Sequence, residues 1–241
     1  MRARVSLLAS VFFNSEILAL IGLGLTFWGA FFIYVTPTKY VKLDFLTASV
    51  NASLSNIERI LTSEKTDSKG VYLPPKYLKD YQSSLVFIPS VSDSSLLKPE
   101  RSLLDNGTLH SKDPKGILLT PPGSDLCKLF EKELKKSFTD TDFHEVQKDL
   151  PRLLEKLRIA KSTTIQQTGN IVTVEVRRHI FEDLCKETMK LQRTHESIGC
   201  LLPSAMACVF AKATGKPFII EKEEWTPEKE GTKFTFHMGD D

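Results

Sequence analysis

The sequence lacks the residue spacings that most catalytic and metal sites require. Its four cysteines form no C-x-x-C pair, and its five histidines form no H-x-x-x-H or H-x-H pair. No serine lies in a G-x-S-x-G elbow, and no G-x-G-x-x-G follows an expected strand. The triplet Thr214-Gly215-Lys216 is not a P-loop, because residue 210 is Phe and the expected order is helix then strand. We therefore expect no catalytic, cofactor-binding or metal-ligating residue and a non-enzymatic protein.

The chain also lacks an excess of charge of either sign. Lys and Arg number 32 against 30 Asp and Glu, a net charge of +2 over 241 residues. Basic and acidic residues alternate, as in "FEKELKKSF", whereas nucleic-acid-binding proteins gather basic charge on one face. Nucleic acid is therefore not an expected partner.

The cysteines suggest buried thiols rather than a disulfide framework. A chain of this length can bury a core without covalent cross-links. We expect the four to be reduced and mostly buried: Cys127, Cys185, Cys200 and Cys208. His195 and Cys200 lie five residues apart, which is no evidence of a catalytic dyad, so a packed thiol and a surface imidazole are expected.

One long apolar run lies near the N-terminus. Residues Ile17–Val35 carry no charge, and Thr36-Pro37-Thr38 follows. About 20 helical residues span a bilayer core of about 30 Å, so a transmembrane helix is predicted over residues 17–36. A buried core helix and a cleaved signal peptide are the alternatives; the first is seldom so long, and the second has a shorter apolar region. The preceding Val5–Phe13 is too short to span and either extends the helix or lies at the interface.

The orientation of this span is weakly determined. Arg2 and Arg4 precede it, whereas Lys39 and Lys42 follow it, so the positive-inside rule is nearly balanced. The expected lack of disulfides favours a cytoplasmic C-terminal domain. A single-pass membrane protein with a cytoplasmic domain is therefore predicted.

Residues 39–68 are expected to form a juxtamembrane amphipathic helix. Apolar residues recur there at spacings of three and four: Leu46, Val50, Leu54, Ile57 and Leu61. This stripe predicts either a coiled coil that makes a homodimer through residues 46–61, or a helix docked on the chain's own domain.

Residues 69–115 are predicted to be an extended region followed by a flexible linker. Pro74-Pro75 excludes a helix, and residues 84–90 form a short strand pattern. From residue 90 onward, Ser, Asp, Pro and Lys dominate without periodicity.

Residues 116–241 predict an α+β domain of helices packed on two β-hairpins that form an antiparallel sheet. Gly169-Asn170 marks the first hairpin, and Pro151 marks a helix start or a kink. A mostly apolar helix follows Pro203-Ser204 and ends at Gly215, before a strand that begins the second hairpin. The acidic residues of that hairpin are expected to form a solvated edge: Glu223, Glu224, Glu228 and Glu230.

The order of helices and hairpins, with a buried helix running into the "GKPFII" strand, resembles the 4-vinyl-reductase-type ligand-binding domain and the related fold of vesicle-tethering TRAPP subunits. That resemblance implies a cysteine before the buried helix, which Cys200 matches, and a cysteine pair around the last hairpin, which this chain lacks. The motifs "YLPPKYLKD", "TPPG" and "LPSAMAC…KATGKP" also resemble an uncharacterised archaeal membrane-protein family.

These observations predict a membrane-anchored domain that binds a small apolar ligand or a protein partner. The ligand pocket is expected between the buried helix and the hairpins, lined by Met206, Cys208, Phe210, Val174 and Phe236. The alternative is a membrane-tethered dimeric scaffold that presents its soluble domain to other proteins.

Overall fold

The computed structural model describes residues 16–35, 43–77, 84–90, 110–112, 115–226 and 230–240. The chain divides into two compact units, Met1–Leu46 and Thr47–Asp241. The predictions for Val5–Phe13, for Lys39 and Lys42, and for most of the linker over 90–115 lie outside the described residues.

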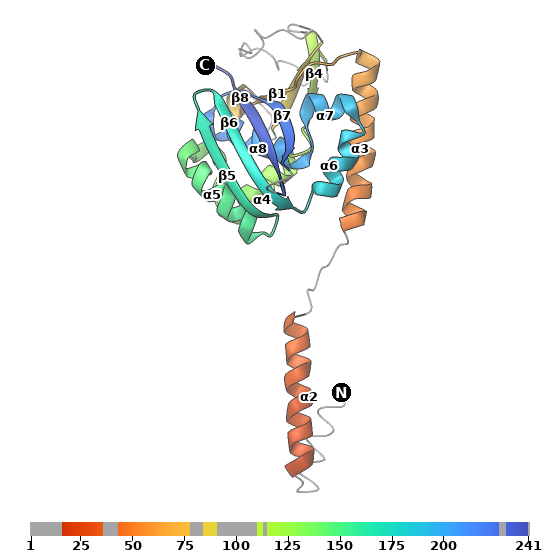
Figure 1. The fold of residues 1–241 in the computed structure, drawn as a ribbon, viewed down its shortest axis with the longest axis vertical. Helices are drawn as coiled ribbons and strands as arrows, with labels where there is room; N and C mark the ends of the chain where they lie inside the picture. The colour runs from red at the N-terminus through yellow and green to blue at the C-terminus, as the bar shows by residue number, and fades with distance from the viewer. Residues whose placement is uncertain are drawn as a thin grey trace. The chain divides into compact units, whose positions relative to one another are not determined.

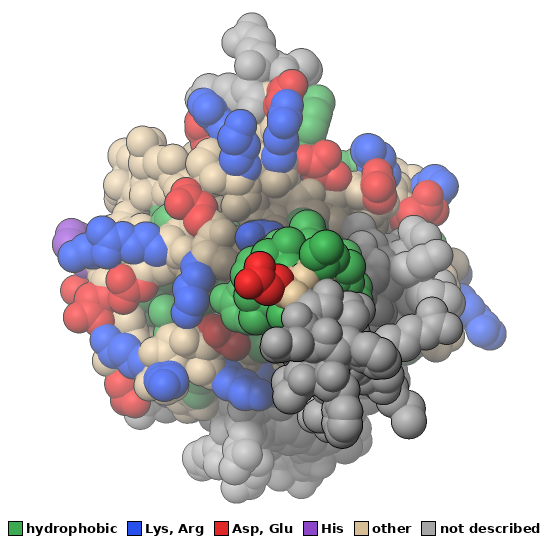
Figure 2. All heavy atoms as spheres, turned by 90° about the horizontal axis from the view of Figure 1, so that it is seen from below, with side chains coloured by type: hydrophobic (Ala, Val, Ile, Leu, Met, Phe, Trp, Pro, Cys, Tyr) green, Lys and Arg blue, Asp and Glu red, His purple; other side chains and the backbone are tan. Residues whose placement is uncertain are grey.

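Helix α2 (Glu16–Val35) is the main described element of the first unit. It confirms the predicted helix and ends one residue before residue 36. Its large apolar side chains are exposed: Ile17, Leu20, Ile21, Leu23, Leu25, Phe27, Trp28, Phe31, Phe32, Ile33, Tyr34 and Val35. Figure 2, which views the molecule from below, shows mainly hydrophobic side chains at the near end of α2, whereas the visible face of the domain mixes Lys and Arg with Asp and Glu.

Two described stretches are strongly apolar helices. Residues Gln192–Thr214 are long and apolar enough to cross a membrane, but 78% of their most apolar window is buried inside the protein. That stretch is therefore a core element. The apolar part of α2, Ala19–Val35, is shorter.

Eight strands within the described residues form one antiparallel sheet. They are β1 (Val71–Leu73), β2 (Leu85–Pro89), β3 (His110–Lys112), β4 (Lys115–Leu119), β5 (Ala160–Thr168), β6 (Ile171–His179), β7 (Phe218–Thr226) and β8 (Gly231–Met238). Their spatial order is β3-β4-β2-β1-β7-β8-β6-β5 (Figure 1). The predicted α+β class and antiparallel sheet are confirmed, and the two expected hairpins are β5–β6 and β7–β8.

The sheet begins well before residue 116, where the domain was predicted to start. β1 pairs with both β2 and β7, so residues from the expected extended region lie in the middle of the sheet. The short strand predicted near residues 84–90 is confirmed as β2. A local pattern can indicate a strand, but it does not show which distant strand that strand pairs with, as β1 does with β7.

Helices cover the sheet and complete the core. They are α3 (Leu43–Glu64), α4 (Ser124–Leu134), α5 (Phe143–Lys156), α6 (Glu182–Met189), α7 (Gln192–Ile198) and α8 (Leu201–Thr214), with 3-10 turns η1 (Pro75–Tyr77) and η3 (Phe138–Asp140). Pro151 lies within α5 and does not end it. α8 is buried from Leu202 to Ala211, and Phe210 packs its ring against Phe143, Phe218 and Phe236.

The start of α8 is joined to β1 and α4 through one buried serine. The Tyr72 hydroxyl donates to the Ile198 carbonyl at 2.6 Å and lies 2.9 Å from Ser204 Oγ. Ser204 Oγ also accepts a hydrogen bond from the Gly123 amide at 3.0 Å. A Cβ on Gly123 would overlap the backbone of Ala205. The glycine of the "TPPG" motif therefore lets α4 begin in direct contact with α8.

Helix α3 docks on the domain, as one of the two interpretations of its apolar stripe predicted. Leu54 is 1% exposed and Leu61 is 0% exposed, both within the chain itself. Glu58 accepts hydrogen bonds from the Thr194 amide at 2.8 Å and the Thr194 hydroxyl at 2.7 Å, so it caps the start of α7. Leu54 and Leu61 are already covered, so among the stripe residues whose side chains the structure describes, the half-buried Val50 and Ile57 remain for a second copy. A homodimer through residues 46–61 stays a prediction.

A fragment of residues 116–241 should therefore fail to fold cooperatively, whereas residues 43–241 should unfold in one transition. The shorter fragment loses buried core residues that include Leu61, Tyr72, Val86 and Ile88. Each contributes about 1.5–3 kcal/mol, and four together rival a total stability of about 5–15 kcal/mol. Urea titration followed by circular dichroism measures this; similar transition midpoints for the two fragments would contradict the architecture.

Candidate functional site

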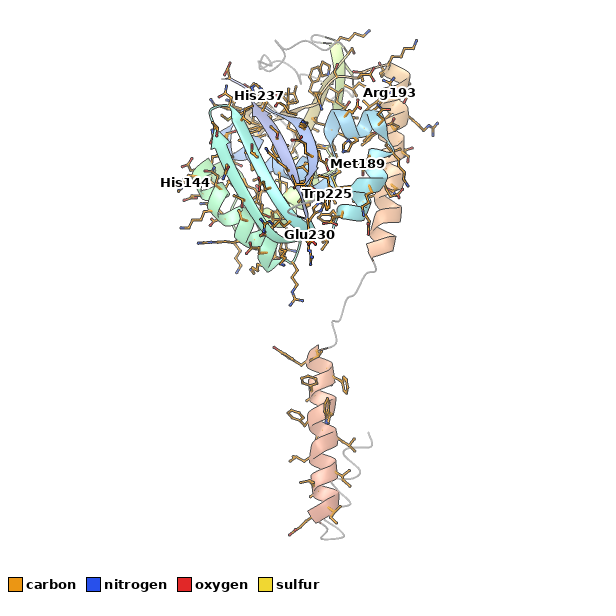
Figure 3. The ribbon with its side chains drawn as sticks, in the orientation of Figure 1. His144, Met189, Arg193, Trp225, Glu230 and His237 are labelled. Atoms are coloured by element: carbon orange, nitrogen blue, oxygen red, sulfur yellow. A yellow bond between two sulfur atoms is a disulfide. The ribbon has the colours of Figure 1, made fainter. Side chains whose placement is uncertain are left out.

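A pocket of about 300 Å³ lies between α6 and the ends of β6, β7 and β8. We name it the α6 pocket and define it by its lining residues: His179, Glu182, Cys185, Lys186, Met189, Glu223, Trp225 and Thr232. Met189 and Trp225 are half exposed at its rim, and Figure 3 shows them close together, one from α6 and one from β7. The pocket thus combines two large apolar side chains at its rim with charged and polar side chains in its lining.

The helical side of the pocket follows from the period of α6. Glu182, Cys185, Lys186 and Met189 are spaced by three, one and three residues, so they share one face of the helix. Buried Leu184 and Thr188 lie on other parts of the helix. This face of the eight-residue helix therefore lines the pocket with a carboxylate, a sulfur, an ammonium group and a thioether.

The strand side of the pocket depends on a β-bulge in β7. Ile220 pairs with Phe236, but the next pairs are Lys222 with Thr235 and Glu223 with Phe234, so Glu221 is an extra residue. One extra residue reverses which face the following side chains occupy. Glu223 therefore lies on the same face as buried Phe234 rather than in solvent.

The solvated acidic edge predicted for the last hairpin is consequently wrong at Glu223, whose side chain is only 4% exposed. Its Oε2 lies 3.2 Å from His195 Nε2, and its Oε1 lies 3.8 Å from Cys200 Sγ. Glu224 and Glu230 do form surface ion pairs, with Lys222 and Arg178, and Glu228 is outside the described residues. No alternation pattern reveals a bulge in advance, so sequence reasoning missed Glu223.

The prediction of four reduced thiols is wrong for two of them. Cys185 of α6 and Cys200, which precedes α8, are joined by a disulfide with Cα atoms 5.5 Å apart. Cys127 and Cys208 are free and buried, as predicted. Fifteen residues separate the bonded pair, and only the α6–α7 turn brings them together. The cytoplasmic location was argued from an absence of disulfides, so it stays a prediction without that support.

Three candidate metal-binding side chains converge at the pocket wall, two of them from its lining. One ligand atom from each of Cys185, Cys200 and Glu223 lies within 4.8 Å of the others. Thiolates, not disulfide sulfurs, bind metal ions. In the disulfide form this group is therefore not a metal centre, and reduction is required before its sulfurs could ligate anything.

Two residues that line the pocket each carry a buried polar atom that has no hydrogen-bond partner among the described residues. The atoms are His179 Nδ1 and Glu182 Oε1. His179 is 4% exposed, and its burial lowers the pKa of the imidazole from 6.5 to about 4, so the ring is neutral at pH 7. Unpartnered buried polar atoms are costly, and a ligand that hydrogen-bonds them recovers that cost.

The pocket residues predicted from the sequence lie elsewhere. Met206, Cys208, Phe210, Val174 and Phe236 are at most 1% exposed and belong to the main hydrophobic core. Phe210 and Phe236 are in edge-to-face contact at 5.2 Å. The structure brings these five residues into one cluster, but none of them lines the α6 pocket. An apolar sequence pattern indicates that residues are buried, but it does not show whether they pack in the core or line a cavity.

Replacing His179 by Gln should flatten part of the acid dependence of stability. The unfolded imidazole binds a proton below pH 6.5 and the folded one only below about 4, so stability falls as pH decreases across that window. The pKa shift corresponds to a loss of about 3 kcal/mol in the free energy of unfolding on acidification, and the variant should not show this loss. Urea unfolding between pH 7 and pH 4 measures the difference. The exposed His144 on α5 supplies the control, His144→Gln; equal slopes for wild type and His179→Gln would refute the buried neutral ring.

Comparison with curated proteins and with solved structures gave no match. The resemblance to the 4-vinyl-reductase-type domain therefore stays a prediction. Over residues 3–190 the sequence matches a family described as a domain of unknown function, DUF7982. This match covers more than half of the chain, from before α2 to just beyond α6, and the chain therefore belongs to the DUF7982 family.

Proposed function

We propose that the protein is a membrane-anchored, non-enzymatic binding domain, with α2 as its anchor and the α6 pocket as its ligand site. The observation that carries the proposal is the α6 pocket, which combines an apolar rim with two lining residues whose buried polar atoms have no partner in the described part of the chain. The family match supports linking the anchor with the pocket, because the matched residues 3–190 include both α2 and α6.

The exposed apolar surface of α2 supports the anchor. A 20-residue helix is about 30 Å long, close to the thickness of a bilayer core. The Thr26 hydroxyl donates to the Gly22 carbonyl at 2.6 Å, so this polar group in the middle of the helix is satisfied without water. Trp28 and Tyr34 lie in its C-terminal half, where aromatic rings suit a headgroup region.

The chemistry of the pocket indicates the kind of ligand. Met189 and Trp225 offer an apolar contact at the rim, which suits a flat or aliphatic body. Glu182 Oε1 accepts hydrogen bonds, and a neutral His179 donates or accepts according to its tautomer. A small, mainly apolar molecule with one hydroxyl or amine head fits this combination.

The alternative, a membrane-tethered dimeric scaffold, has weaker support. Its dimer stripe is partly used inside the chain, since Leu54 and Leu61 already pack on the core. Val50 and Ile57 keep some exposed surface for a second copy.

Two arginines in α2 should release the protein from membranes. Leu23 and Phe27 lie one turn apart near the middle of the helix, and each arginine costs about 2.5–3.5 kcal/mol there. The variant Leu23→Arg/Phe27→Arg should move from the carbonate-resistant membrane fraction to the soluble fraction. Leu129→Arg, at an exposed apolar residue of α4, is the matched control and should fractionate like wild type. A wild-type chain that is itself soluble would refute the anchor.

Native mass spectrometry of the full chain released from detergent should show a reproducible added mass that disappears on denaturation. Trp225→Ala should weaken retention of that mass by about 10-fold, because an aromatic contact and its buried area are lost. Leu129→Ala removes a similarly exposed apolar side chain outside the pocket and should retain it. A clean unliganded mass for wild type would favour the scaffold instead.

A further inference from the structure

The two sulfurs of the Cys185–Cys200 disulfide differ in how solvent reaches them. Cys185 lines the α6 pocket and so faces a route from the surface. Cys200 is 0% exposed and does not line the pocket. A small molecule that enters the pocket therefore meets Cys185 first.

The surroundings of Cys200 suit a thiol as well as a disulfide. Glu223 Oε1 lies 3.8 Å from Cys200 Sγ, a distance at which an S–H group can donate a weak hydrogen bond. A disulfide sulfur carries no proton, so in the oxidised form this buried oxygen receives no hydrogen bond from Cys200. The other carboxylate oxygen is held by His195, so Glu223 is already in position for the reduced form.

The pocket is also lined by a cationic side chain. Lys186 follows Cys185 in α6 and lines the same pocket. Its ammonium pairs with Asp183 at 3.0 Å and stays largely exposed. A cation in the pocket lining attracts a thiolate, which is the nucleophile in disulfide exchange.

The geometry points to a redox-active disulfide that exchanges with small thiols entering the α6 pocket, with Cys185 as the attacked sulfur and Cys200 as the buried leaving group. The Cys185–Cys200 pair would thus undergo a covalent reaction, which is a separate function from the ligand binding proposed above. The inference uses the pocket as a route and does not depend on which ligand the pocket holds.

The exchange balances with thiols as the only co-reactant. A thiolate RS⁻ attacks Cys185 Sγ, the Cys185–Cys200 bond breaks, and an RS–S bond forms on Cys185. The electron pair leaves on Cys200, which takes up the proton that the thiol had released. A second thiol attacks the mixed disulfide, forms RS–SR and leaves Cys185 as a thiol. Two thiols are oxidised to one disulfide while the protein disulfide is reduced to two thiols.

The first test measures reduction of the full chain in detergent under native conditions. The protein is exposed to dithiothreitol, quenched with acid, and its thiols are counted by maleimide labelling after denaturation. A bond that opens only on global unfolding would be reduced ~10³-fold or more slowly than in urea. We expect a native rate well above that limit; a rate at the limit would show a structural cross-link and overturn the proposal.

The second test uses the asymmetry of the pair. With Cys200→Ser, the remaining Cys185 should form a mixed disulfide with added cystamine, seen as one adduct by intact-mass spectrometry. With Cys185→Ser, the buried Cys200 should remain unmodified over the same time. Equal labelling of the two variants, or labelling of Cys200 alone, would contradict the assigned roles.

The free cysteines supply an internal control in both tests. Burial raises the pKa of the Cys127 thiol to about 12 and that of Cys208 well above its ordinary value, so neither is a ready nucleophile. Peptide mapping should find no adduct on them while the protein is folded. If the folded protein retains its ligand but its disulfide is not reduced by dithiothreitol, the redox site is refuted and the proposed binding function still stands.

Discussion

Burial of α8 is the constraint on which the rest of the domain depends. The helix has apolar or small residues around nearly its whole circumference, so it is stable in water only if other elements cover every side. The sheet covers one side, and α4, α5 and η3 pack against others. Phe210 of α8 is an example of this coverage, because its ring contacts aromatic side chains of α5, β7 and β8.

This requirement also explains why the domain needs its early strands. A two-hairpin sheet is too narrow to cover a fully buried helix, and β1 and β2 widen it on the side of β7. The hydrogen bonds between Tyr72, Ser204 and Gly123 tie the added strands to the start of α8. The chain from residue 47 onward is therefore one compact unit rather than a domain with a leading linker.

Local patterns revealed the elements whose structure is set locally. The charge-free run predicted α2, the Gly-Asn turn predicted the β5–β6 hairpin, and the small apolar residues before Gly215 predicted α8. Three features depended on distant partners and were not predictable: the place of β1 and β2 in the sheet, the bulge that turns Glu223 inward, and the disulfide. Each is decided by tertiary packing, which composition and spacing do not encode in a single sequence. The site was missed for the same reason, since the apolar residues chosen for it fill space in the core.

The α6 pocket lies at the limit of the family match. The matched region ends at residue 190, so α6 falls inside it, whereas Glu223, Trp225 and Thr232 come from the two strands beyond it. One wall of the pocket therefore belongs to the part of the chain that defines the family, and the other wall to the part that follows.

The cap that Glu58 places on α7 has a mechanical consequence. Force applied along α3 passes into α7 through the hydrogen bonds to Thr194, and α7 ends at Ile198, just before Cys200. The disulfide then carries that load across to α6. The α3 backbone also leads directly to β1, and the backbone already joins α6 to α7, so the disulfide acts in parallel with these connections. A load on α3 is therefore shared among several links, and the disulfide is the one that ties the start of α8 to the helical wall of the pocket.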